Sequence, residues 1–310
     1  MGGSGGGSYT NWNAASLSRE VREDQKKATA GFEIQLSGFL AELLASYNSR
    51  DVDLVRERLE EAKDVLEGTV ESTLDQIFGG SVAKHTYVDG ISDIDSLVVV
   101  NGSKFEDHRP ATILEHMREV LESALRDRAT VEHGQLAVTI TYRDGMAVQL
   151  LPAIRTEDGG LRIPAAKHAG WSEINPDSFS AALSKRNELC GGRLVPTIKL
   201  AKAVIANMPE QYRLSGYHVE SLAIAAFRDY SGAMTTSVML PHFFDQAKNL
   251  VLAPIKDRTG QSIHVDEHLG DANSLARQYT SRLLGNLAKR MTNASAAQSR
   301  TQWEALFAEE

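Results

Sequence analysis

Two aspartates, Asp93 and Asp95, stand one residue apart at the start of a short apolar segment, residues 94–100. The segment is rich in β-branched residues, which predicts a buried strand. Alternate residues of a strand project from the same face, so the two carboxylates would lie close together. Oxygen donors in such a pair suit a hard divalent cation. The sequence therefore predicts a site for Mg²⁺, or Mn²⁺, at the tip of this strand.

A glycine-rich turn precedes the two aspartates. Gly80 and Ser81 offer backbone N–H groups and a hydroxyl, which together can cradle a phosphate. A carboxylate pair that follows a phosphate cradle indicates nucleotidyl transfer, in which metal ions activate an attacking hydroxyl and hold a triphosphate. Each motif alone is common in turns that have no function. The interpretation therefore depends on their ordered combination.

Two lysines further along the chain are candidates for the triphosphate. Lys199 and Lys202 are three residues apart on a predicted helix and would share one face. Their ammonium groups suit the β- and γ-phosphates of a nucleotide. The alternative is an ordinary solvated helix face, which is the commoner meaning of such a pair.

The elements that must position these residues can be read from periodicity. Apolar residues at helical spacing predict two helices over about 14–78 with a break near 46–49, and a further helix over 111–128. One Asp-Gly turn between apolar runs predicts a hairpin of strands 137–142 and 146–151. Helices are expected again from about 179 to the C-terminus, with an irregular interval near 240–270.

This order predicts an α+β fold, in which a mixed sheet with helices carries the metal site and packs against a helical bundle. We expect a flexible Gly/Ser tag or linker at 1–8, a core lobe with the N-terminal helices at 9–175, and a helical lobe at 176–310. The first long helix is expected to span both lobes, and nucleotides to bind between them.

Composition limits the function classes. The 310 residues carry a net charge of −8 and one cysteine, Cys190, which excludes an internal disulfide framework. An acidic balance argues against a binder of duplex nucleic acid. The chain has no apolar run long enough for a membrane span and no signal-peptide pattern at its start, so we expect a cytoplasmic protein. His264 and His268 have a metal-like spacing but lack the rest of a zinc motif.

The run from Gly80-Ser81 to Gly90-Ile91-Ser92-Asp93-Ile94-Asp95 resembles the signature of DNA polymerase β-type nucleotidyltransferases. More closely, the chain is similar to the bacterial cGAS/DncV-like nucleotidyltransferases (CD-NTases) over roughly residues 30–290. Further matches to that family are Met146–Pro152 with Ala153, Ile163-Pro164, Trp171, Asn175-Pro176, Asn187, Gly191–Pro196, Lys199, Tyr217-His218-Val219-Glu220, Asp257 and Thr259-Gly260.

The resemblance implies a polymerase β-like core with a C-terminal helical bundle. It also implies an enzyme that joins nucleoside triphosphates without a template into a cyclic or short linear second messenger. Such messengers act on an effector protein in anti-phage (CBASS-like) signalling. In this family the helix of Lys199 and Lys202 carries the triphosphate lysine, and Tyr217 would stack on a base, although a core tyrosine is an equal alternative. The family's phosphate-binding serine position holds Gly216, and Ser215 precedes it.

The chain departs from the family at Gln149, where a third metal-binding aspartate is expected. An amide is a weak metal ligand and cannot act as a base, so turnover would fall. Three explanations stay open: an introduced inactivating change, a natural member that binds without turnover or works with two carboxylates, or replacement by a neighbouring acid such as Asp144 or Glu132. A linear oligonucleotide synthase, for example of oligodeoxyadenylate, and a nucleotide-binding pseudoenzyme are the alternative functions.

Overall fold

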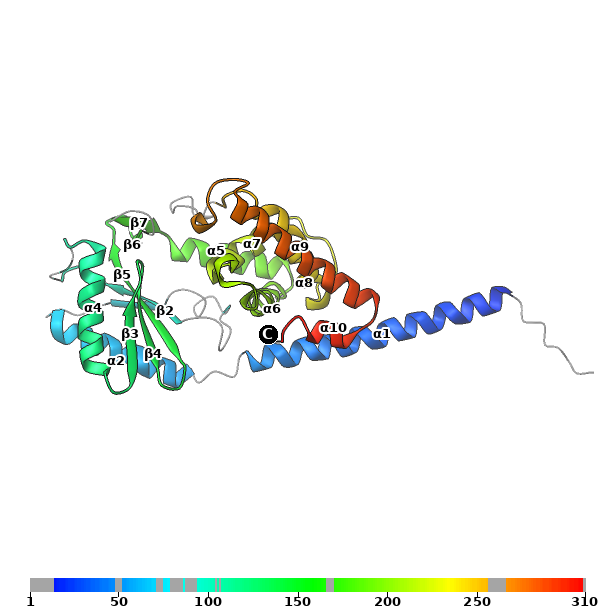
Figure 1. Ribbon diagram of the computed structural model, residues 1–310, viewed down its shortest axis with the longest axis horizontal. Helices are drawn as coiled ribbons and strands as arrows, with labels where there is room; N and C mark the ends of the chain where they lie inside the picture. The colour runs from blue at the N-terminus through cyan, green and yellow to red at the C-terminus, as the bar shows by residue number, and fades with distance from the viewer. Residues whose placement is uncertain are drawn as a thin grey trace, which may run out of the picture.

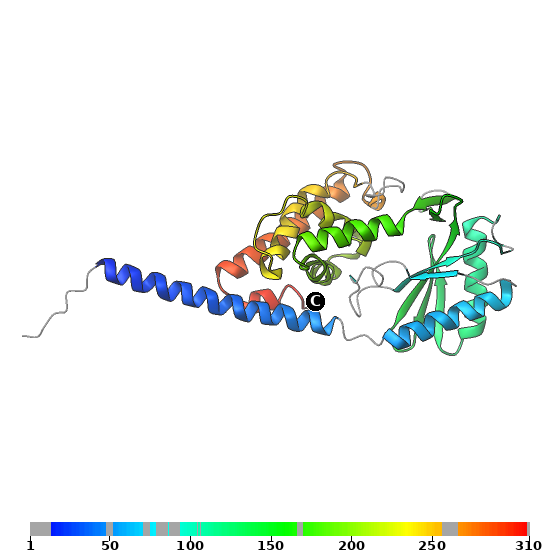
Figure 2. The same ribbon diagram turned by 180° about the vertical axis from the view of Figure 1, so that it is seen from behind.

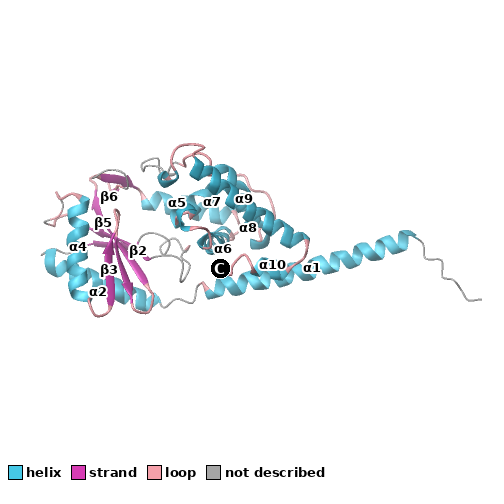
Figure 3. Cartoon of the chain, viewed as in Figure 1, coloured by secondary structure: helices cyan, strands magenta, loops and turns pink. Residues whose placement is uncertain are grey.

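The computed structural model describes residues 14–47, 52–70, 75–78, 86, 94–103, 105, 107–165, 170–255 and 266–308. The chain forms a lobe built on a β-sheet, here called the sheet lobe, and a second lobe made of helices, the helical lobe (Figure 1). The strands among the described residues all lie in the sheet lobe (Figure 3). The predicted α+β fold, a sheet with helices next to a helical bundle, is confirmed.

The sheet is mixed. Its main path runs β1-β2-β5-β4-β3, and β6 and β7 continue from β5. The β2–β5 pair is parallel, whereas the other pairs are antiparallel. The strands are β1 (Asp75–Phe78), β2 (Ile94–Val99), β3 (Ala129–His133), β4 (Val138–Tyr142), β5 (Ala147–Arg155), β6 (Leu161–Pro164) and β7 (Trp171–Ile174).

Two helices, α2 (Val52–Val70) and α4 (Pro110–Leu125), pack against one face of this sheet. Alternate strand residues such as Val98, Val148 and Leu150 are buried in that core with Leu59. Residues of the opposite parity form a separate small cluster, made of Leu97, Val99, Ala153 and Leu161. Strand alternation therefore gives the sheet two distinct faces, of which only one is covered by α2 and α4.

The helical lobe buries the largest core of the chain. Its elements are α5 (Pro176–Leu189), α6 (Leu194–Ala206), η1 (Glu210–Tyr212), α7 (Gly216–Ala226), α8 (Thr236–Leu250), η2 (Glu267–Leu269), α9 (Leu275–Ala296) and α10 (Arg300–Glu304). In α6 and α7 almost every residue is apolar or buried, which is typical of helices surrounded by others.

The long helix α1 (Ala14–Ser46) belongs to the helical lobe, because Phe32, Leu36, Phe39 and Leu40 lie in its core. Helical spacing places these four side chains on one face. The N-terminal part of α1 extends beyond the body of the molecule (Figure 2). The predicted division, with both N-terminal helices in the first lobe, and the prediction that α1 spans both lobes are therefore wrong: α2 packs with the sheet and α1 with the helices.

Several local predictions need correction. Residues 75–78 form β1 where a helix was expected, because pairing with β2 determines the structure of a segment too short to show a period. Strands β3, β6 and β7 were not expected from the sequence, and α8 continues regularly to Leu250 although an irregular interval was expected from about residue 240. The hairpin is confirmed, with Gly145 at a φ of 87° in its turn. Among the described residues, no helix has the length and apolar character of a membrane span.

Candidate nucleotide site

The parallel strands β2 and β5 bring the candidate metal positions together. Their register pairs the backbone of Asp95 with that of Gln149. Position 149 is therefore next to the carboxylate strand, where the third carboxylate is expected. Asp93, Gly80 and Ser81 lie outside the described residues, and Asp95 is described through its backbone. Gln149 itself is half-buried.

Glu132 lies in the same cross-strand row, but too far away to replace a carboxylate at 149. The register pairs Glu132 with Thr139 and Thr139 with Gln149. Neighbouring strands are about 4.8 Å apart, so Glu132 is roughly 10 Å from Gln149 and roughly 14 Å from Asp95 along the sheet. A single ion needs its oxygen ligands within about 2–2.6 Å, so Glu132 and Asp95 cannot share one.

Asp144 has a different role in the hairpin turn. Its Oδ1 and Oδ2 accept hydrogen bonds from the Arg58 guanidinium of α2 at 3.0 and 2.6 Å, and the Met146 N–H donates to Oδ1 at 3.1 Å. The hydrogen bonds from Arg58, and then the one from Met146, lower the pKa of Asp144. This carboxylate fixes the turn to α2, so neither neighbouring acid replaces the missing aspartate.

The donor set is compatible with a divalent cation held by Asp93 and Asp95, and Gln149 adds a neutral amide oxygen at the third position. Within the described ranges, no group of three histidine, cysteine, aspartate or glutamate side chains has the geometry of a metal site. The sequence therefore keeps both aspartates of the predicted pair, and position 149 carries a neutral amide in place of a negative charge and a base.

The lysines of α6 have unequal surroundings. Lys202 is 4% exposed, and its Nζ donates to Glu220 Oε1 at 2.9 Å and to the Thr86 carbonyl at 3.0 Å. The alternative of an ordinary solvated helix face is therefore wrong for Lys202, and a triphosphate contact of Lys202 stays a prediction that this burial does not favour. Its charge is compensated within the protein by a carboxylate of α7.

Lys199 is half-buried on the same helix. Burial, and then the positive charge of Lys202, lower the pKa of Lys199. Both causes oppose the charged form of the amine. A bound anion would favour that form, so the position is suited electrostatically to a phosphate.

The N-terminus of α7 adjoins Lys202. The Ser215 hydroxyl caps α7 and accepts a hydrogen bond from the His218 N–H at 3.2 Å. A Cβ at Gly216 would lie 3.2 Å from Lys202 Nζ, which is tighter than ordinary contact. Glycine therefore fits beside the buried lysine. The position where a phosphate-binding serine was expected carries no hydroxyl, and the preceding residue, Ser215, does.

The Tyr217 ring packs on the Phe179 ring, with centroids 4.3 Å apart and planes inclined by 35°. Tyr217 is half-buried at the edge of the helical core. Part of the core-tyrosine alternative is therefore correct, since one side of the ring contacts Phe179. Whether a base stacks on it stays a prediction.

Two motifs that the resemblance singled out form local structure. Asn187 at the end of α5 accepts the Val195 N–H through Oδ1 at 3.0 Å, and its carbonyl accepts the Gly192 N–H. Gly191 and Gly192 have φ of 59° and 76°, which glycine adopts at low cost. This run is the turn that reverses the chain between α5 and α6.

The role of Glu220 is not evident from the sequence. Its only local signal is a single acidic residue in a helix whose other residues are almost all apolar. Such a charge in a buried helix requires a partner. The partner, Lys202, lies on another helix, and local patterns do not identify it.

A second buried ion pair, between Asp266 and Arg277, lies beside His218 of α7. His218 is fully buried, with Nε2 3.7 Å from Asp266 Oδ2, and Asp266 pairs with Arg277 Nη1 at 2.5 Å. Burial lowers the pKa of His218 to about 4. Neither ring nitrogen of His218 has a hydrogen-bond partner among the described residues. His268 lies in η2 nearby, and His264 is outside the described residues.

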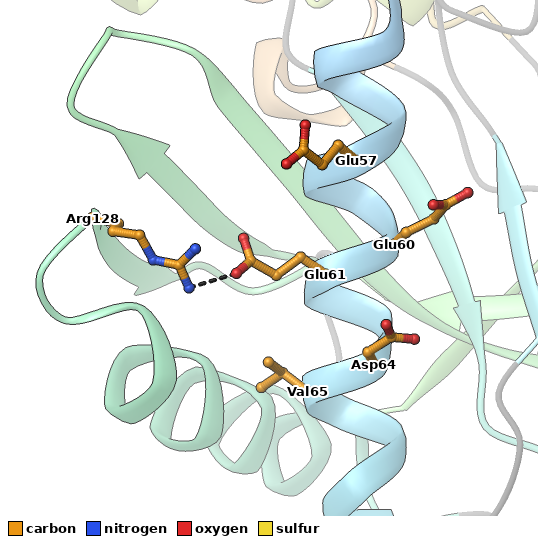
Figure 4. A pocket seen from close by; sticks show the side chains of 6 residues that line it. All are labelled: Glu57, Glu60, Glu61, Asp64, Val65 and Arg128. Carbon is orange, nitrogen blue, oxygen red and sulfur yellow. Dashed lines mark ion pairs between the residues drawn. The ribbon is translucent and has the colours of Figure 1, made fainter.

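An open depression of about 390 Å³ on α2 lies apart from these residues. Figure 4 shows its carboxylates spaced along α2, with the Arg128 guanidinium paired to Glu61 at 2.5 Å. Its lining is formed by Glu57, Glu60, Glu61, Asp64, Val65 and Arg128. Four acidic side chains would repel a triphosphate, so this depression is not the nucleotide site.

Residues 34–187 match the family described as the Second Messenger Oligonucleotide or Dinucleotide Synthetase (SMODS) domain. This range contains α2, α4 and the whole sheet. Comparison with curated protein sequences gives no match.

Solved structures share the fold over most of the chain. The Bradyrhizobium diazoefficiens CD-NTase CdnG in complex with GTP is 18% identical, with a TM-score of 0.68 over 88% of this chain and 95% of that one. The E. coli MS115-1 CdnC:HORMA-deltaN complex is 17% identical, with a TM-score of 0.64 over 88% of this chain and 96% of that one. E. coli DncV in its 3′-deoxy GTP bound form is 13% identical, with a TM-score of 0.59 over 94% of this chain and 88% of that one. The chain thus matches the SMODS domain over residues 34–187 and shares the fold of these CD-NTase structures.

Proposed function

We propose that this chain is a template-independent nucleotidyltransferase that joins nucleoside triphosphates into a cyclic or short oligonucleotide second messenger. The observation that carries the proposal is the SMODS match, which spans the β2–β5 pair that aligns Asp95 with Gln149. The messenger would act on an effector protein in anti-phage defence, a role that rests on the family alone.

The proposed roles follow from charge and position. Asp93 and Asp95 would hold Mg²⁺ or Mn²⁺, which when bound neutralises triphosphate charge and activates a hydroxyl. Gly80 and Ser81 would cradle phosphate. Lys199 is the lysine we assign to the triphosphate, because it is half-buried on α6, whereas Lys202 on the same helix is 4% exposed and paired with Glu220.

The N-terminus of α7 supplies the remaining contacts. Ser215 accepts a backbone N–H as the helix cap, which leaves its O–H to donate to a phosphate oxygen. Tyr217, whose ring packs beside Phe179, would stack on a base. Both residues lie on the helix that adjoins α6 through the buried ion pair.

Gln149 favours a second candidate function, a nucleotide-binding protein with little or no turnover. The metal-binding pair would still hold a nucleotide–metal complex, but no carboxylate at 149 assists deprotonation of the attacking hydroxyl. A linear rather than cyclic product is a further form of the first function.

The test is product analysis by mass spectrometry after incubation of the full chain with Mg²⁺ and mixed NTPs and dNTPs. We expect a cyclic or short linear oligonucleotide whose formation is lost in Asp93→Asn and Asp95→Asn. Tight Mg·ATP binding without product would support the second function. Neither binding nor product, in a folded chain, would contradict both.

A further inference from the structure

A buried ion pair joins α6 to α7 next to the N-terminus of α7. The Nζ–Oε1 distance between Lys202 and Glu220 is 2.9 Å, and the side chains are 4% and 1% exposed. Two charges removed from water regain little net free energy from their own attraction. The other residues that such a pair binds are therefore more informative than the attraction between its two charges.

The third member of this cluster comes from the part of the chain between β1 and β2. The Thr86 hydroxyl donates to Glu220 Oε1 at 2.5 Å, and the Thr86 carbonyl accepts from Lys202 Nζ at 3.0 Å. Thr86 is fully buried. One carboxylate oxygen of Glu220 thus accepts both from Lys202 and from Thr86, so all three residues form one network.

The position of Thr86 in the sequence links this network to the proposed nucleotide site. Thr86 follows Ser81 and precedes Asp93, between β1 and β2. The residues proposed to cradle phosphate and to bind metal therefore lie on either side of it in sequence. Lys202 and Glu220 belong to the helical lobe, which also carries Lys199 and Tyr217.

We propose that Glu220 is a positioning residue: with Lys202 it anchors Thr86 to α6 and α7, and so sets the phosphate- and metal-binding segment of the sheet lobe against the triphosphate and base contacts of the helical lobe. The anchor itself is independent of function, whereas its effect on nucleotides rests on the function proposed above.

The anchor depends on the hydroxyl of Thr86 and on the charge of Glu220, which conservative variants separate. Thr86→Val keeps the shape and removes the donor, and Thr86→Ser keeps the donor. Glu220→Gln keeps an oxygen acceptor and removes the charge. Thr197→Val is the matched control, because Thr197 is a fully buried threonine of α6 whose Oγ1 bonds to the Arg193 carbonyl of its own helix.

Hydrogen–deuterium exchange on the full chain tests the anchor without any nucleotide. The peptide that contains Thr86 should exchange at least tenfold faster in Thr86→Val and Glu220→Gln than in the wild type. Thr86→Ser should remain within twofold of the wild type, and so should Thr197→Val. Unchanged exchange in both Thr86→Val and Glu220→Gln would overturn the anchor.

Calorimetric titration with Mg·ATP tests the positioning role. The dissociation constant should rise at least fivefold in Thr86→Val, return to within twofold in Thr86→Ser and stay unchanged in Thr197→Val. Faster exchange with unchanged Mg·ATP affinity would make the network merely structural and overturn the positioning role. A wild-type chain that binds no Mg·ATP would contradict the proposed function and with it the positioning role, while the exchange data would still decide whether Thr86 is anchored.

Discussion

Asp95 and Gln149 are register partners on the parallel strands β2 and β5. The backbone of the sheet therefore presents position 149 next to the carboxylate strand, in the place where the related nucleotidyltransferases resembled by this sequence carry an acid. The scaffold of the site is kept and one functional group is changed. An amide at this place alters the chemistry of metal binding and proton transfer without altering the strand pairing.

Replacement of Gln149 by aspartate should restore a general base and a third metal ligand. We expect Gln149→Asp to raise the rate of oligonucleotide formation by about 10²–10⁴, the usual size of general-base assistance. Gln149→Asn has the same length as aspartate without the charge and should give no gain. Initial rates from chromatographic product analysis compare the two variants, and equal rates would show that position 149 does not limit turnover.

Removal of the neighbouring acids should leave the site intact. Asp144 is bound to Arg58 and Glu132 lies two strands from Gln149, so Asp144→Asn and Glu132→Gln should change Mg·ATP affinity by less than about twofold. The Arg58–Asp144 pair, in which the carboxylate side chain is 48% exposed, should contribute about 1 kcal/mol to stability. A large loss of Mg·ATP affinity in either variant, measured by calorimetry, would restore that acid as the substitute ligand.

The Lys202–Glu220 pair should show strong thermodynamic coupling. Lys202→Met leaves the buried Glu220 carboxylate without its ammonium partner and should lower the free energy of unfolding by about 3–5 kcal/mol. In the double variant Lys202→Met/Glu220→Leu the unpaired charge is absent, so a large part of that loss should be recovered. Urea unfolding at pH 7 gives both values. Losses that simply add would contradict a direct interaction.

Stability should depend on pH through His218. Its pKa is lowered by burial to about 4, below the ordinary value of about 6.5. Burial and the positive charges of His268 and Arg277 act in this direction, and Asp266 opposes them. The unfolded chain thus binds a proton between about pH 6.5 and 4 that the folded chain does not, so stability falls as the pH falls through this range.

Across that range the contribution is on the order of 3 kcal/mol. His218→Gln does not titrate and should lose less stability between pH 7 and pH 4, by about that amount, in urea unfolding. His108→Gln replaces an exposed histidine and should follow the wild-type curve. Parallel curves for the His218 variant and the wild type would exclude this residue as the source of the acid sensitivity.

The sequence predicts the elements whose signals are local. The β-branched run of β2 and the Asp-Gly turn before β5 lead directly to the two strands that align Asp95 with Gln149. Strand β1 has four residues and no period of its own, so it is determined by its partner. The side of the molecule on which α1 packs is likewise set by contacts with distant helices.

In the candidate site, too, local features were predictable from the sequence and long-range contacts were not. Helical spacing correctly places Lys199 and Lys202 on one helix, but the surroundings of each lysine depend on residues from elsewhere in the chain. Thr86 and Glu220 are 134 residues apart in sequence. No periodicity or propensity joins them, so the buried network could be found only in the folded chain.

The most direct test of the account is a crystal structure of the full chain with a non-hydrolysable ATP analogue and Mg²⁺. The account predicts the triphosphate between the Asp93–Asp95 pair and Lys199, with Gln149 beside the metal and the base at Tyr217. Nucleotide bound elsewhere, or a triphosphate that contacts neither aspartate, would contradict it.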